Sequence, residues 1–189
     1  MDFQAAKMRY ASMTGRGINN IIAGVLLWGA LGLLGLILPE TPFISSQWHK
    51  AIIYLLGAGL LFPLGLLVGH LMQLDTFAKG HPMAKLSGFV GGMQVLFIPI
   101  MLGAYFTSPE HVPWYLASLV GAHFLPFYWV YDSKAYLFGS IGLVIVAAWG
   151  GFIMLEDSFV IVPFGVMLVL AAMVIILWRA NEKDAVSFN

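Results

Sequence analysis

The sequence predicts an all-α, polytopic membrane protein built as a six-transmembrane-helix bundle. Hydrophobic residues make up 60% of the 189 residues and charged residues only 10%, whereas about a quarter of a soluble domain is charged. Apolar segments recur along the chain at roughly the 20-residue length that a helix needs to cross a bilayer. Because short loops join these segments, we expect residues 1–189 to form a single membrane domain whose main partner is the lipid bilayer.

Composition also excludes several classes of function. The chain has no cysteine, which excludes disulfides, thiolate catalysis and iron–sulfur sites. Its formal net charge of zero argues against a surface that binds polyanions, so we expect no nucleic-acid partner. We expect no cofactor.

Residues 1–16 predict a short helix that lies on the cytoplasmic membrane surface. Phe3, Ala6, Tyr10 and Met13 fall near helical spacing. The lysine and arginine residues of the same segment would face anionic lipid headgroups. A frayed, positively charged tail is the alternative. A cleaved signal peptide is not expected, because the apolar run that follows is of full spanning length and has no small-residue cleavage site after it.

Six apolar runs follow this segment. In the first, Gly29, Gly32 and Gly35 recur at every third residue and form a smooth stripe that another helix can approach closely. Pro39 and Pro42 end this run. The expected crossings are residues 18–38, 51–72, 86–106, 114–132, 136–155 and 159–178.

The distribution of lysine and arginine predicts the orientation of the bundle. With six crossings both termini lie on one side, and that side receives eight of the nine bases, leaving only Lys50 on the other. Lys and Arg are enriched in cytoplasmic loops, so we expect both termini in the cytoplasm and the protein in the cytoplasmic (inner) membrane. The eight bases are Lys7, Arg9, Arg16, Lys79, Lys85, Lys134, Arg179 and Lys183, and the opposite side carries the acids Glu40, Glu110, Glu156 and Asp157.

Two polar side chains, Gln94 and His123, stand out by their depth in the membrane. Both lie near the middle of an expected crossing, about 10 residues from either surface. Prolines inside three crossings should kink the helices and each release the carbonyl four residues earlier. These kinks are at Pro63, Pro99 and Pro126, and the freed carbonyls belong to Gly59, Val95 and Ala122.

These groups together predict a small polar pocket or water site in mid-membrane, because backbone acceptors in hydrocarbon need partners. We take Gln94 and His123 as its candidate ligand-binding residues. Tyr128 and Asp132 are four residues apart on one helix face and form a candidate pair at the cytoplasmic mouth. The alternative is that His123 only joins two helices through a hydrogen bond.

Metal and enzyme functions have little support in the sequence. No spacing of the type His-x-x-x-His occurs, although His49 and His111 share a side with several acids, and we assign no metal ligand. A hydrolase would need a nucleophile beside a base. Ser118 lies on another face of the same helix than His123. Ser140 or Ser87 could still contact His123 from another helix, and nothing favours this. We assign no catalytic residue.

One run of residues resembles a known family. The run GAHFLPFYWVYDSKAYLFGSI, with LLFPLGLLVGHLMQLD and the Met93-Gln94 pair, is similar to a family of small bacterial membrane proteins whose function is unassigned. The resemblance extends from the second to the fifth crossing and implies no activity or cofactor. Phe127 departs from it, since the family has tyrosine there. The matching residues are His123, Leu125, Pro126, Trp129, Tyr131, Ser133, Lys134 and Tyr136.

Two functional hypotheses follow from the sequence. The first is a protein that binds or transports a small molecule at the polar layer around Gln94 and His123. The second is a structural or interaction protein, a homo-oligomer packed through glycine-rich faces, in which His123 only joins helices. An intramembrane enzyme is a distant third.

Overall fold

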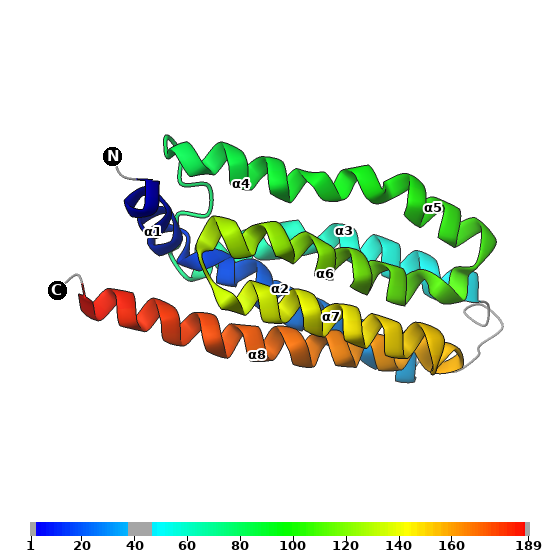
Figure 1. Ribbon diagram of the computed structural model, residues 1–189. Coiled ribbons are helices and arrows are strands. Elements are labelled where there is room, and N and C mark those ends of the chain that lie inside the picture. Colours follow the sequence, from blue (N-terminus) through cyan, green and yellow to red (C-terminus); the bar gives the residue numbers. More distant parts are fainter. Residues whose placement is uncertain (1–2, 38–46, 188–189) are drawn as a thin grey trace.

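The computed structural model describes residues 3–37 and 47–187, and Figure 1 shows that its long helices run antiparallel along one axis. Pro39, Glu40 and Pro42 lie outside the described residues. The helices are α1 (Phe3–Met13), α2 (Ile18–Ile37), α3 (Gln47–Leu71), α4 (Pro82–Gly92), α5 (Ile98–Thr107), α6 (Val112–Tyr131), α7 (Lys134–Phe152) and α8 (Ser158–Ser187). Short 3₁₀ turns connect them: η1 (Gly15–Gly17), η2 (Met93–Phe97), η3 (Pro109–His111) and η4 (Leu155–Asp157).

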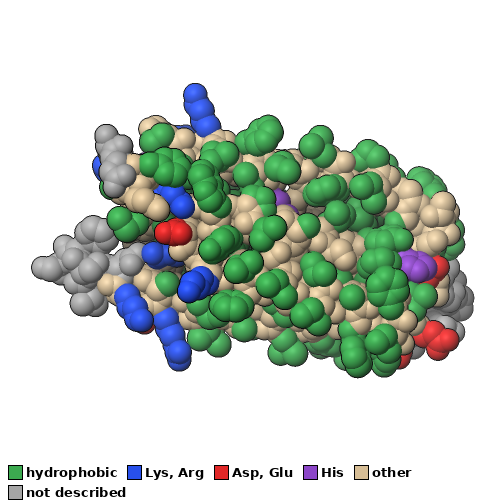
Figure 2. Space-filling view, viewed as in Figure 1, with side chains coloured by type: hydrophobic (Ala, Val, Ile, Leu, Met, Phe, Trp, Pro, Cys, Tyr) green, Lys and Arg blue, Asp and Glu red, His purple; other side chains and the backbone are tan. Residues whose placement is uncertain are grey.

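The prediction of an all-helical chain with several membrane-spanning segments is confirmed. Among the described residues, five segments are long and apolar enough to cross a membrane. Their side chains are inverted relative to a soluble bundle: Leu56, Phe89 and Phe152 are 66–77% exposed, and hydrophobic side chains cover the sides of the molecule in Figure 2. So much exposed apolar surface indicates a membrane-embedded protein. The five segments are Gly15–Ile37, Gln47–Leu71, Pro82–Thr107, Lys134–Phe152 and Leu155–Lys183.

Helix α6 falls outside this group because His123, Pro126 and several aromatic residues lower its hydropathy. It nevertheless runs the full length of the bundle (Figure 1). It packs against α7 most closely and also contacts α3, α4, α5 and α8. Its neighbours therefore shield it on several sides.

Charged side chains separate to the two ends of the bundle. Helix α1 and the end of α8 lie together at one end (Figure 1), and Lys and Arg gather there (Figure 2). Acidic side chains are conspicuous at the opposite end, where the turns η3 and η4 contain Glu110, Glu156 and Asp157. The uneven distribution of Lys and Arg along the sequence thus becomes a difference in charge between the two ends of the bundle.

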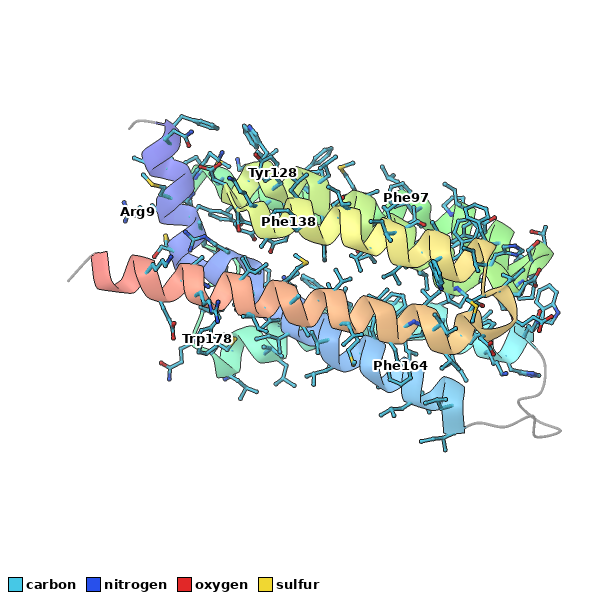
Figure 3. All side chains as sticks on the ribbon, turned by 60° about the horizontal axis from the view of Figure 1, so that its bottom comes forward. Arg9, Phe97, Tyr128, Phe138, Phe164 and Trp178 are labelled. Atoms are coloured by element: carbon cyan, nitrogen blue, oxygen red, sulfur yellow. The ribbon has the colours of Figure 1, made fainter. Side chains whose placement is uncertain are left out.

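The glycine stripe of α2 packs against α8. A Cβ on Gly29 would lie 3.0 Å from the Met167 sulfur, and one on Gly32 would lie 3.1 Å from the Phe164 ring. Figure 3 shows Phe164 between the two helices. At Gly35, a Cβ would collide with the backbone carbonyl of Phe159. The missing side chains therefore let the two helices approach to backbone contact.

A buried tyrosine completes the contact at Gly35. Pro163, inside α8, cannot donate a hydrogen bond to the Phe159 carbonyl four residues earlier. The Tyr54 hydroxyl of α3 donates to that carbonyl instead, and the Leu31 carbonyl of α2 lies 3.3 Å from the same hydroxyl. Tyr54 is only 2% exposed. One side chain thereby joins α2, α3 and α8 at a backbone group that the membrane would otherwise leave without a partner.

We predict that Tyr54→Phe lowers the free energy of unfolding by about 1–3 kcal/mol, because it leaves a buried carbonyl without a donor. Pro163→Ala restores a backbone N–H at the right position, so Tyr54→Phe should cost much less in that background. The measurement is a double-mutant cycle of thermal unfolding in lipid nanodiscs.

The matched control is Tyr105→Phe. The Tyr105 ring packs against Trp48 at 5.3 Å between centroids, and its hydroxyl makes no hydrogen bond within the described ranges, so stability should change little. Equal costs of Tyr54→Phe with and without Pro163 would contradict the role assigned to the tyrosine.

Candidate functional site

The imidazole of His123 lies on α6 without a hydrogen-bond partner among the described residues. The side chain is half-buried, and its contact is the edge of the Phe127 ring, 5.1 Å away between centroids. The hydrogen bond by which this histidine would join two helices is not formed, either with Gln94 or with a carbonyl of the described residues. His123 therefore keeps both ring nitrogens available to another group.

Gln94 lies in η2, where the long helix formed by α4 and α5 tightens into a 3₁₀ turn. Pro99 cannot donate to the Val95 carbonyl, but the backbone N–H of Ile98 bonds to it within the turn. The turn thus satisfies locally the acceptor that the proline releases. Gln94 is half-buried, and η2 contacts α6, the helix that carries His123.

Pro63 and Pro126 lie inside α3 and α6, which continue as helices through them. In the described part of the chain, no side chain donates to the carbonyls of Gly59 or Ala122, which these prolines release. Ala122 directly precedes His123. A carbonyl without a side-chain donor and an imidazole without a hydrogen-bond partner among the described residues are thus adjacent in the sequence of α6.

Tyr128 and Asp132 meet through the backbone. Asp132 caps α6 in a left-handed conformation, with φ of 49°, and its N–H donates to the Tyr128 carbonyl. The Asp132 carboxylate instead approaches the ammonium of Lys7 on α1, at 3.9 Å. The Tyr128 side chain is partly exposed, so Asp132 and Lys7 form the charged pair at this mouth.

Lys7 differs from the expectation that the bases of α1 face headgroups. It is only 4% exposed, and its ammonium lies 4.9 Å from the centroid of the Trp129 ring. A buried lysine needs such compensation, because removing an ammonium from water is costly. The pairing follows from how α1 lies across the bundle, which no local pattern in residues 1–16 indicates.

Sequence reasoning also missed a cluster of buried tyrosines where α1 meets α6 and α7. Tyr131 stacks on Tyr10 at 5.8 Å and on Tyr136 at 5.3 Å between centroids. Burial raises the pKa of the Tyr10 hydroxyl, and a hydrogen bond with Ser87 partly offsets that rise. Tyr10 therefore stays protonated, as a donor, across the physiological pH range.

The signal that could have revealed this cluster is the Gly-Arg-Gly sequence of η1. All three residues have positive φ, between 52° and 68°, which glycine adopts readily and arginine does not. A Cβ on Gly17 would lie 3.0 Å from the hydroxyls of both Tyr131 and Tyr136. The left-handed turn thus lets α1 fold back over the ends of the long helices.

Hydrogen bonds hold Arg16 in its strained conformation. The Tyr136 hydroxyl donates to the Arg16 carbonyl at 2.6 Å. The Arg16 guanidinium donates to Asn181 Oδ1 at 2.6 Å, and Asn181 Nδ2 donates to the Gly15 carbonyl at 3.0 Å. The start of α2 is thereby tied to α7 and to the end of α8.

The residues considered for metal binding and catalysis form neither a metal site nor a serine–histidine pair in the described part of the chain. No group of three His, Asp or Glu side chains that could hold a metal ion occurs among the residues that the structure describes. His111 Nδ1 lies 3.2 Å from Glu110 Oε1 but is not aligned as a hydrogen bond. Ser87 is engaged with the tyrosine cluster, and no described serine hydrogen-bonds to His123.

Residues 3–180 match a family of unknown function, DUF7010. The expected resemblance to an uncharacterised family is confirmed, and the match extends beyond the second to fifth crossings to nearly the whole chain. Neither a curated protein nor a solved structure matches this chain.

We predict that Asp132→Asn loosens α1, because it leaves the buried Lys7 ammonium without its carboxylate while asparagine still accepts the left-handed backbone. The cost should be about 1 kcal/mol, since Asp132 is mostly exposed to solvent. Faster amide hydrogen exchange confined to α1 is the expected readout.

Lys7→Met in the Asp132→Asn background supplies the control. It keeps an apolar stem against Trp129 and removes the uncompensated charge, so protection of α1 should return. Unchanged exchange in Asp132→Asn would contradict the role of this pair.

Proposed function

We propose that this chain, which belongs to the DUF7010 family, binds or transports a small molecule at a mid-membrane polar layer formed by Gln94 and His123. The observation that carries the proposal is the imidazole of His123, which has no hydrogen-bond partner among the described residues. Leaving such a group without a partner in hydrocarbon costs several kcal/mol, on the order of 4. A ligand that hydrogen-bonds to the imidazole removes this cost.

The backbone around the layer supports the same proposal. Irregular backbone at membrane depth is tolerated where protein buries it or where it lines a cavity, and a 3₁₀ stretch inside a helix often marks a functional hinge. The turn η2 is such a 3₁₀ stretch, between α4 and α5, and it carries Gln94. The Ala122 carbonyl released by Pro126 supplies a further acceptor beside His123.

The charges of the layer limit the chemistry of its ligand. Among the described residues, Lys, Arg, Asp and Glu lie in α1, in the turns and loops, or near the ends of the long helices. Gln94 offers a carbonyl and an amide, and His123 offers one donor and one acceptor when neutral. We therefore infer an uncharged polar ligand, because an ion would find no opposite charge here.

We further propose that α6 is a sixth crossing and that both termini face the cytoplasm. The 20 residues of α6 extend about 30 Å, the thickness of the hydrocarbon core. Contacts with α3, α4, α5, α7 and α8 compensate for its lower hydropathy. The bases gathered at the end with α1 (Figure 2) support a cytoplasmic location for that end and insertion in the cytoplasmic membrane.

We predict that His123→Phe weakens binding of the ligand at least about tenfold, the cost of one buried hydrogen bond, and leaves the unfolding temperature unchanged or higher. The measurement is ligand-induced thermal stabilisation of the purified protein across a panel of uncharged metabolites and lipids.

The matched control is His70→Phe, since His70 is exposed at the end of α3 and should not affect binding. If His123→Phe instead lowers the unfolding temperature by several degrees and leaves every ligand shift intact, His123 is a structural residue.

A second candidate function is a structural one, as a homo-oligomer joined through α4. The segment Pro82–Thr107 is the least buried of the five candidate membrane-spanning segments, because only 17% of its 18-residue apolar stretch is buried. Gly88 and Gly92 lie four residues apart on α4, and a Cβ on either would meet open space. This is the spacing at which membrane helices of two copies pack closely.

If α4 joins two copies, Gly88→Leu should abolish dimers that are cross-linked in nanodiscs, because a bulky side chain separates the helices. Gly59→Leu is the control, since Gly59 faces open space on α3 instead. A wild-type protein that is monomeric at all concentrations tested would eliminate this candidate.

A further inference from the structure

A cavity of about 260 Å³ opens at the end of the bundle where η1 meets α8, apart from the His123 layer. Its apolar wall consists of Ile18, Met72, Leu74 and Trp178. Figure 3 shows Trp178 between α8 and the end of α3. The cavity is smaller than the roughly 300–1,000 Å³ of pockets that enclose a whole small molecule. It therefore suits one end of an amphiphile whose remainder lies in the bilayer.

The polar wall of the cavity carries an acid and an aromatic ring held together. The indole N–H of Trp178 donates to Glu182 Oε1 at 2.8 Å. This bond fixes the ring and the carboxylate as one unit on α8 and leaves the second carboxylate oxygen available. A carboxylate beside a tryptophan face is a combination that attracts an ammonium group.

The surroundings of the cavity are basic. Arg16 lies at its edge, because its guanidinium bonds to Asn181, which lines the cavity. Arg179 follows Trp178 and is exposed, and other bases gather at this end (Figure 2). This positive field disfavours a bare cation but complements a ligand that also carries a phosphate.

We propose that this cavity binds the headgroup of a zwitterionic phospholipid that carries a primary ammonium group, as phosphatidylethanolamine does. The ammonium lies between the Glu182 carboxylate and the Trp178 ring, and the phosphate faces the basic rim of Arg16 and Arg179. The glycerol and upper acyl carbons follow the apolar wall toward the hydrocarbon. This site is independent of the one proposed at His123.

The test compares lipid binding by native mass spectrometry of the full-length protein. The probes are phosphatidylethanolamine, its N-acetyl derivative and a short-chain alkylamine. The N-acetyl derivative lacks the positive charge of the ammonium, and the alkylamine lacks the phosphate. The wild type should bind phosphatidylethanolamine at least tenfold more tightly than either. Glu182→Gln should remove the preference over the N-acetyl lipid.

Two controls keep the test specific. Glu156→Gln changes an exposed acid at the opposite end and should retain the preference. His123→Phe should also retain it, which separates this site from the mid-membrane layer. Equal binding of the two lipids by the wild type, a preference that survives Glu182→Gln, or equally tight binding of the alkylamine would each overturn the proposal.

Discussion

The fold depends on one constraint: a backbone carbonyl inside the membrane must find a donor within the protein. At the junction of α2, α3 and α8, Pro163 removes the donor that the Phe159 carbonyl would have in a regular helix. Gly35 lets this carbonyl approach α2, and the Tyr54 hydroxyl donates to it. Three helices are thereby held in one arrangement by a polar contact, where the hydrophobic effect gives little preference between lipid and protein.

The carbonyls released by the other prolines differ in whether a donor is found. Before Pro99 the helix tightens, and the Ile98 N–H bonds to the Val95 carbonyl. Around Pro63 and Pro126, in contrast, no described side chain donates to the released carbonyl. Of these two released carbonyls, only that of Ala122 lies next to a polar side chain, His123, and this difference makes α6 the centre of the proposed binding layer.

At the end of the bundle that gathers the bases, hydrogen bonds between polar groups organise the structure. The left-handed turn of Gly15, Arg16 and Gly17 folds α1 back over the long helices. Tyr136 and Asn181 stabilise that turn through hydrogen bonds. The N-terminal segment, for which the sequence predicts a short surface helix, thereby contributes Ser12 to the wall of a cavity at this end of the bundle.

Much of the fold follows from the sequence alone, because length, hydropathy and charge are properties of local segments. The long helices, the close packing allowed by Gly32 and Gly35, and the gathering of bases at one end are visible in the residues themselves. The partners of the polar groups are not. Tyr54 and the Phe159 carbonyl are 105 residues apart, and Arg16 and Asn181 are 165 apart. Only the tertiary structure decides which distant groups meet, because a hydrogen bond between helices depends on their rotation and depth, to which hydropathy is insensitive.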